Sequence, residues 1–252
     1  MKQTVNPKHL KLLTGAAGVL GCMFRAALYA GGVDRKGLLI TGHWSSIGVW
    51  LLTAAVAAVM LLRCRLLTGP TDYETAFPSS VFSAAGAVLA AVAFVLSPIG
   101  QLPSPALVTM EPVLRFAAAG SLILIGYCRY RGRKPFFLLH CTVCLYLALR
   151  LICQYRIWSV DPQIQNYVFY LGAHVALMIT AYQLAAFDAG CGNHRNLWAA
   201  GLSGIYLSIV SLPGSDDPFF LICCILWIFG NLSHPATGKW PISDRNHTTQ
   251  ED

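Results

Sequence analysis

The chain has 252 residues, of which 56% belong to the hydrophobic set and only 12% are charged. An ordinary soluble domain carries about 25% charged residues, so this composition excludes a soluble globular protein. The low charge also excludes a disordered chain. The apolar runs have the length of helices, unlike the alternating segments of about ten residues that build outer-membrane barrels. The composition therefore predicts an all-α, polytopic integral membrane protein whose first partner is the lipid bilayer.

Eight apolar stretches resemble transmembrane helices, each of which needs about 20 predominantly apolar residues. Three of them begin with an oxygen-bearing side chain and a first-turn proline, a combination typical of helix N-termini: Thr109 with Pro112, Asp161 with Pro162, and Asp217 with Pro218. We expect the last two helices, which are the shortest, to form a hairpin. The predicted bundle covers residues 1–234, with spans at about 10–30, 43–62, 80–97, 110–128, 135–155, 163–187, 196–212 and 217–233.

The basic residues predict the orientation of the bundle. If the N-terminus is cytoplasmic, twelve of the 18 Lys and Arg residues fall on the inner side and only Arg35, Lys36 and Arg156 fall in outer loops. Positive charge concentrates in cytoplasmic loops, so both termini are expected inside, with residues 235–252 as a polar cytoplasmic tail. Most of the net charge of +7 then comes from the basic residues of the inner loops, which set the orientation. No folded basic surface remains for binding a nucleic acid. We expect a multi-pass protein of the cell membrane, of the bacterial inner-membrane type.

The nine cysteines do not predict a metal site or a disulfide framework. None lies in an outer loop of the predicted topology, so no structural disulfides are expected. The segment from His140 to Cys144 has a metal-like spacing, but it lies within one apolar helix and supplies at most three ligands. Packing between helices is the favoured interpretation of these small, soft side chains. No metal or cofactor is expected.

Three arginines lie inside predicted helices, where a cation costs about 2.5 to 3.5 kcal/mol at the helix centre. Arg25 and Arg150 come shortly before the outer ends of the first and fifth helices, and Arg115 comes shortly after the outer start of the fourth. At about 1.5 Å per residue, all three lie at a similar depth, roughly 6 to 8 Å below the outer boundary. This matched depth predicts that they converge on one outward-facing, basic cavity.

Residues at helical spacing extend this candidate site. Residues three or four apart share a face of a helix, which groups Tyr29 with Arg25, Glu111 with Arg115, and both Tyr146 and Gln154 with Arg150. His174 shares a face with Tyr170 on the sixth predicted helix and lies near the middle of the membrane, and His43 opens the second predicted helix at the outer surface. Bidentate arginines suit a carboxylate or a phosphate. The predicted ligand-binding set is Arg25, Arg115, Arg150, Tyr29, Tyr146, Gln154, His174, Glu111 and His43.

A structural interpretation of the same arginines stays open. Enough acidic residues fall on the outer side to pair with each of them, and the arginines can also reach lipid headgroups. In that case the cluster contains ion pairs and binds no ligand. The acidic residues on the outer side are Asp34, Glu111, Asp161, Asp216 and Asp217.

Three classes of function compete at this stage. The leading hypothesis is binding or transport of a small anionic solute or a lipid headgroup, because cations are retained in a bundle that has no soluble domain. The second is a membrane-embedded enzyme acting on a lipid-linked substrate, and the third is a non-catalytic sensor or assembly protein that works with a partner subunit. No spacing resembles a zinc HExxH site, a GxSxG elbow or a phosphate loop. Candidates for catalysis by residue type alone are His43, His140, His174, Glu111 and Asp188.

Overall fold

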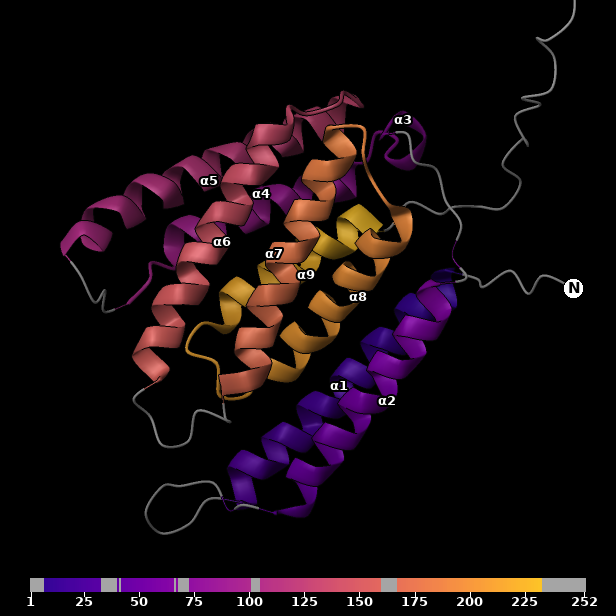
Figure 1. Ribbon diagram of the computed structural model, residues 1–252, viewed down its shortest axis with the longest axis vertical. Coiled ribbons are helices and arrows are strands. Elements are labelled where there is room, and N and C mark those ends of the chain that lie inside the picture. The colour runs from indigo at the N-terminus through magenta and orange to yellow at the C-terminus, as the bar shows by residue number, and fades with distance from the viewer. Residues whose placement is uncertain are drawn as a thin grey trace, which may run out of the picture.

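The computed structural model describes residues 7–32, 40, 42–65, 67, 73–100, 105–159 and 167–232, and in them the fold is all-α, as predicted (Figure 1). Each of the eight predicted stretches overlaps a helix, and a short additional helix, α3, follows α2. The predicted tail at 235–252 lies outside the described residues. The helices are α1 (Pro7–Gly31), α2 (Trp44–Cys64), α3 (Tyr73–Ala76), α4 (Val81–Leu96), α5 (Pro105–Arg131), α6 (Phe137–Trp158), α7 (Val168–Asp188), α8 (His194–Ser211) and α9 (Pro218–Leu232).

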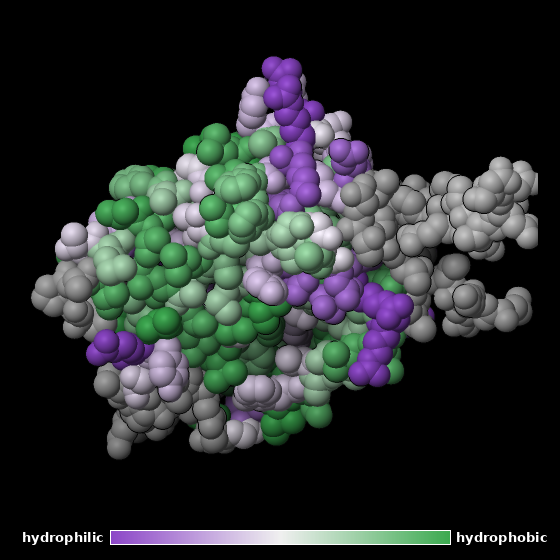
Figure 2. All heavy atoms as spheres, turned by 45° about the horizontal axis from the view of Figure 1, so that its top comes forward, coloured by the Kyte–Doolittle hydropathy of each residue, from purple (hydrophilic) through white to green (hydrophobic). Residues whose placement is uncertain are grey.

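In the part of the chain that the structure describes, five helices are long and apolar enough to cross a membrane: α1, α2, α5, α6 and α7. The apolar helices α4 and α9 are shorter, with 16 and 15 residues. At about 1.5 Å per residue they rise roughly 24 Å and 23 Å, less than the hydrocarbon core of about 30 Å. Large apolar side chains are also exposed on the outside of the bundle, such as Leu12 and Leu51. Figure 2 shows apolar side chains spread across much of one face, which is the surface expected of a protein that faces lipid.

Six helices close into a circuit of neighbours. In the order α4, α5, α6, α7, α8 and α9, each packs against the next, and α9 packs against α4 again. The hairpin of α1 and α2 lies outside this circuit, where both helices contact α8 (Figure 1). The backbones of α4 and α9 approach closely, because a Cβ atom on Gly86 would lie 2.8 Å from the Leu226 carbonyl oxygen. Glycine is required there to let the two backbones meet.

The helix starts confirm one predicted cap and correct another. Asp217 caps α9, since its Oδ1 accepts the Phe220 backbone N–H at 3.0 Å. The start predicted at Thr109 and Pro112 is wrong: α5 begins five residues before the predicted start at 110, and Pro112 lies inside it. Interior proline is tolerated in membrane helices because neighbouring groups satisfy the freed carbonyl. The pair Asp161 and Pro162 lies outside the described residues, and α7 is described only from Val168.

Candidate functional site

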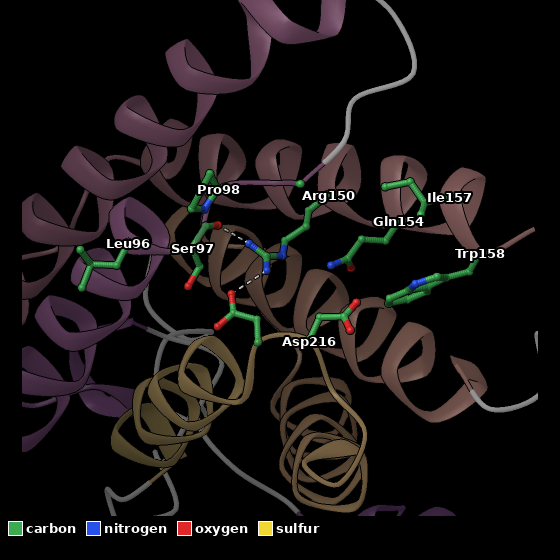
Figure 3. Close-up of a pocket in the computed structure, with 10 residues that line it drawn as sticks. Leu96, Ser97, Pro98, Arg150, Gln154, Ile157, Trp158 and Asp216 are labelled. Carbon is green, nitrogen blue, oxygen red and sulfur yellow. Dashed lines mark hydrogen bonds and ion pairs between the residues drawn. The ribbon is translucent and has the colours of Figure 1, made fainter. Parts of the chain in front are cut away.

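A cavity of about 510 Å³ opens at the end of the bundle where α4 and α6 finish and α9 begins. Figure 3 shows an arginine, an amide, carboxylates and an indole directed into it from several segments of the chain. Such a volume lies within the range of about 300 to 1,000 Å³ that is usual for small-molecule sites. The lining residues are Leu96, Ser97, Pro98, Gly100, Arg150, Gln154, Ile157, Trp158, Asp216 and Asp217.

Arg150, on α6, is the central side chain of the cavity and is only 2% exposed. Its Nη1 donates to the Ser97 carbonyl at 2.6 Å, and its Nη2 donates to Asp217 Oδ2 at 2.9 Å (Figure 3). The guanidinium lies 4.0 Å from the centre of the Phe220 ring. Its Nε has no hydrogen-bond partner among the described residues. The guanidinium is therefore held in a fixed plane by its contacts with Ser97, Asp217 and Phe220.

The turn between α8 and α9 brings two carboxylates to the cavity. Asp217 both caps α9 and pairs with Arg150, while its neighbour Asp216 is exposed and points to the side of the cavity that holds Trp158 (Figure 3). Gly214, with a φ of 77°, makes the tight turn between the two helices possible. The described lining thus contains one basic and two acidic side chains, whereas the sequence led us to expect a basic cavity.

Two further helix faces complete the wall. Gln154 Nε2 donates to the Tyr170 hydroxyl at 3.0 Å, and Gln154 Oε1 has no partner among the described residues. Tyr170 also packs edge-on against Trp158 at 5.1 Å between ring centres. His174 lies one turn further along α7, where its Nδ1 bonds the Tyr170 carbonyl and its ring stacks on Phe220. These contacts fix the amide and aromatic groups that face the cavity.

Glu111 does not line the cavity but holds neighbouring segments that do. Its Oε1 accepts the Ile99 backbone N–H at 3.3 Å and the Tyr146 hydroxyl at 3.5 Å, and it lies 3.6 Å from Arg115 Nε. Glu111 thereby ties α5 to the segment after α4 that carries the Ser97 carbonyl. Arg115 is paired within its own helix and does not line the cavity.

The remaining predicted site residues lie on the α1 and α2 hairpin. Arg25 Nη2 donates to the Tyr29 hydroxyl at 2.8 Å, and the guanidinium lies 5.1 Å from the centre of the Phe169 ring. Tyr29 packs against Gly214, in the turn that carries the two aspartates. His43 forms a 2.6 Å hydrogen bond with Ser45. None of these three residues lines the cavity, so of the three arginines only Arg150 does.

The structure adds site residues that the sequence prediction did not include. Asp217 was predicted as a helix cap, both Asp216 and Asp217 were predicted only as acids able to pair with an arginine, and Trp158 was not assigned to the site. The signal for Asp217 was present in the sequence as an acidic residue beside a helix start on the outer side. That Asp217 pairs with Arg150 could be identified only from the fold. Comparison with protein-family models, with curated proteins and with solved structures found no match to this chain.

Proposed function

We propose that this chain is a multi-pass protein of the cell membrane that binds, and carries across the bilayer, a small solute or a lipid headgroup in the cavity around Arg150. The observation that supports this most directly is the buried arginine itself. A cation kept inside a membrane bundle is expensive and usually functional. Here it is oriented by Ser97, Asp217 and Phe220, it lines a cavity, and its buried Nε has no hydrogen-bond partner among the described residues.

The charges of the lining favour a ligand that carries both signs. An anionic oxygen of the ligand would bind Arg150, either at Nε or in place of Asp217, which sits on a partly exposed turn. A neighbouring ammonium would then meet the Asp216 carboxylate and the vacant acceptor at Gln154 Oε1. A purely anionic ligand would leave both carboxylates repelling it. The proposed ligand is therefore a zwitterion of the phosphoethanolamine or amino-acid kind, free in solution or as a lipid headgroup.

We further propose eight spans with both termini cytoplasmic, so that the cavity faces outward. Arg195 donates to the Leu67 carbonyl at 3.0 Å, and the Tyr73 hydroxyl donates to the Arg133 carbonyl. These contacts gather the basic end of α5, the start of α8 and the segment after α2 at one end of the bundle. Positive charge marks the cytoplasmic side. Arg150 lies toward the opposite end of α6.

A binding experiment on the purified protein in lipid vesicles tests the proposal. The probes are inorganic phosphate, ethanolamine, phosphoethanolamine and a short-chain phosphatidylethanolamine, with binding measured by calorimetry. We expect one of the two zwitterions to bind at least tenfold more tightly than either phosphate or ethanolamine. The soluble zwitterion and the lipid distinguish a free solute from a headgroup.

Variants of α6 connect binding to the cavity. Arg150→Lys keeps the charge but cannot reproduce the planar fork of donors, so it is expected to weaken binding tenfold or more. Arg156→Ala is the matched control, because Arg156 is on the same helix but is exposed and does not line the cavity. Equal loss in both variants, or zwitterion binding no tighter than phosphate binding, would overturn the proposal.

A further inference from the structure

A second polar cluster lies at the other end of the bundle. His140 Nδ1, on α6, and Asp188 Oδ2, at the end of α7, form a 2.5 Å hydrogen bond, and both side chains are fully buried. The outer atom of each group, His140 Nε2 and Asp188 Oδ1, has no hydrogen-bond partner among the described residues. Buried polar atoms without partners are rare and call for an explanation by a ligand, a water or a functional role.

Arg129, on α5, compensates the charge of this pair. It is 2% exposed, it interacts electrostatically with Asp188, and its guanidinium lies 3.8 Å from the centre of the Phe77 ring. None of its three side-chain nitrogens has a hydrogen-bond partner among the described residues. A neutral His140, an ionised Asp188 and Arg129 together carry no net charge, so one more proton changes the charge of a buried site by a full unit.

Among the described residues, the groups that interact with the pair come from α3, α5 and α9. Those that interact with Asp188 are Tyr73 on α3 and Cys128 on α5, besides Arg129. Burial raises the pKa of Tyr73 to about 12, although Arg129 acts to lower it, so this phenol stays protonated at neutral pH. From α9, the Trp227 indole stacks near the His140 ring at 6.5 Å between centres and has no ionisable proton in this range. His140 and Asp188 are therefore the groups in this cluster suited to take up a proton.

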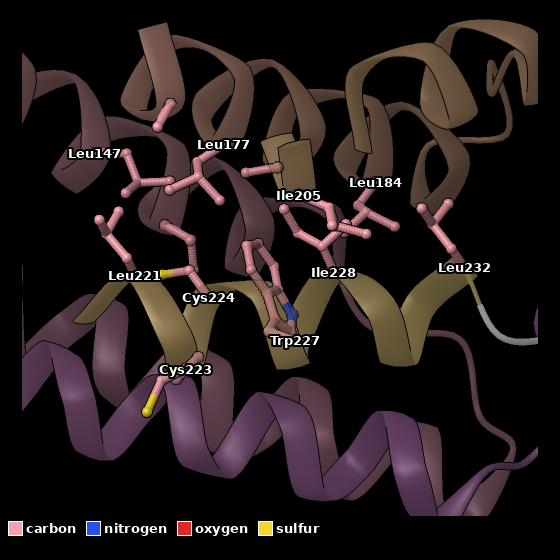
Figure 4. Packing of buried hydrophobic residues seen from close by; sticks show 14 of the residues in the cluster. Leu147, Leu177, Leu184, Ile205, Leu221, Cys223, Cys224, Trp227, Ile228 and Leu232 are labelled. Carbon is pink, nitrogen blue, oxygen red and sulfur yellow. The ribbon is translucent and has the colours of Figure 1, made fainter. Parts of the chain in front are cut away.

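Water reaches the chain immediately beside the pair. Asp188 is the last residue of α7, and the next residues, Ala189 and Gly190, are exposed. Toward the middle of the bundle, in contrast, apolar side chains fill the space between the helices, among them Leu147, Leu177 and Leu184 (Figure 4). A proton can thus arrive from the near end, which is the cytoplasmic end of the proposed topology, while the dry interior blocks its passage further in.

We propose that His140 and Asp188 form a proton-binding site that communicates with the cavity through α6 and α7. A hydronium ion on the cytoplasmic side transfers its proton to the lone pair of His140 Nε2 and is left as a neutral water molecule, while Asp188 holds the Nδ1 side of the ring. The pair joins the same two helices that carry Arg150 and His174. Those residues lie 10 and 14 positions away, or roughly 15 Å and 21 Å along the helices. Protonation of His140 would change how α6 packs on α7 at the end near Asp188. Because the same two helices carry Arg150 and His174, this change in packing would also affect the walls of the cavity at their other end.

Nitrogen-15 NMR of histidine-labelled protein in lipid vesicles tests the proton site, because the ring shifts report protonation. The His140 signal can be assigned through its contact with Trp227, without any substitution. We expect it to change between about pH 8 and pH 5, the interval in which imidazole ordinarily titrates. We expect Asp188→Asn to abolish that change, since a buried imidazolium then loses its counter-charge. His174, which is equally buried but bonds a backbone carbonyl, is the internal control and stays constant.

A His140 ring that keeps one protonation state throughout this interval in the unaltered protein would overturn the proton site. The coupling rests on the proposed function and has its own test. Phosphoethanolamine added to the vesicles is expected to shift the His140 midpoint in the unaltered protein but not in Arg150→Lys. Binding without such a shift would overturn the coupling and leave the proposed function intact. Absence of binding would overturn the proposed function, and the titration of His140 would still decide the proton site.

Discussion

The ion pair between Arg150 and Asp217 is asymmetric, so removing either partner is predicted to have a different effect on stability. The Arg150 side chain is 2% exposed, whereas the Asp217 side chain is 20% exposed and sits on a turn. In Asp217→Ala the guanidinium is left buried without its counter-charge. In Arg150→Met the aspartate can turn toward water, and the new side chain still covers the Phe220 ring.

The expected free energies follow from these exposures. Removing one partner of a fully buried pair costs about 3 to 5 kcal/mol, and we take the lower value because water already reaches Asp217. The lost cap of α9 adds about 1 kcal/mol, so Asp217→Ala is expected to destabilise the protein by about 4 kcal/mol. Arg150→Met loses chiefly the charge-assisted hydrogen bond to the Ser97 carbonyl, which is worth about 1.5 to 3 kcal/mol, so it is expected to cost less than Asp217→Ala.

Equilibrium unfolding in mixed micelles with increasing denaturing detergent measures these differences. Asp216→Ala is the matched control, because Asp216 is the neighbouring carboxylate but is exposed and neither caps a helix nor pairs with Arg150. We expect it to change stability little. The reasoning would be refuted if Asp217→Ala were no more destabilising than Asp216→Ala, or if Arg150→Met were the most destabilising of the three.

Two further predictions concern packing and orientation. Gly86→Ala is expected to destabilise the protein by about 1 to 3 kcal/mol, because the new Cβ atom would meet the Leu226 carbonyl. Gly120→Ala is the control and is expected to be neutral or slightly stabilising, because no atom lies within 4 Å of its Cβ position. Equal midpoints of thermal unfolding in the two variants would contradict this reasoning. In a cysteine-free background, Ser215→Cys is expected to react with an impermeant maleimide on intact cells, whereas Cys191 alone, which is exposed at the opposite end, reacts only after permeabilisation. Labelling of Cys191 from outside would reverse the proposed orientation.

The helices were predictable because their signals are local. An apolar run of helical length has few alternatives in a chain with so little charge, and Asp217 with Pro218 caps α9 where expected. The error at α5 has the same local origin. Thr109 and Pro112 resemble a helix start, but apolar residues before them extend the helix back to Pro105, and a membrane bundle accommodates the interior proline.

The partners of the buried charges were not predictable, because they depend on how distant segments meet. Depth along a helix follows from counting residues, whereas direction around the bundle does not. Arg150 pairs with Asp217, 67 positions away, although several acidic residues were available on that side. His140 was interpreted as a packing residue beside Cys141 and Cys144, and its bond to Asp188, 48 positions away, appears only in the fold.

For the transport proposed above, the positions of the two polar clusters favour a moving carrier over a static pore. Polar side chains gather at both ends of the helical circuit, and Leu147, Leu177 and Trp227 are fully buried between them. A charged ligand that crossed this apolar layer without help would lose its hydration with nothing to replace it. The proposed transport would therefore require α6 and α7 to change their packing so that the cavity opens to the other side. The same two helices hold His140 and Asp188 together, so the proposed proton site lies between the helices that would have to move.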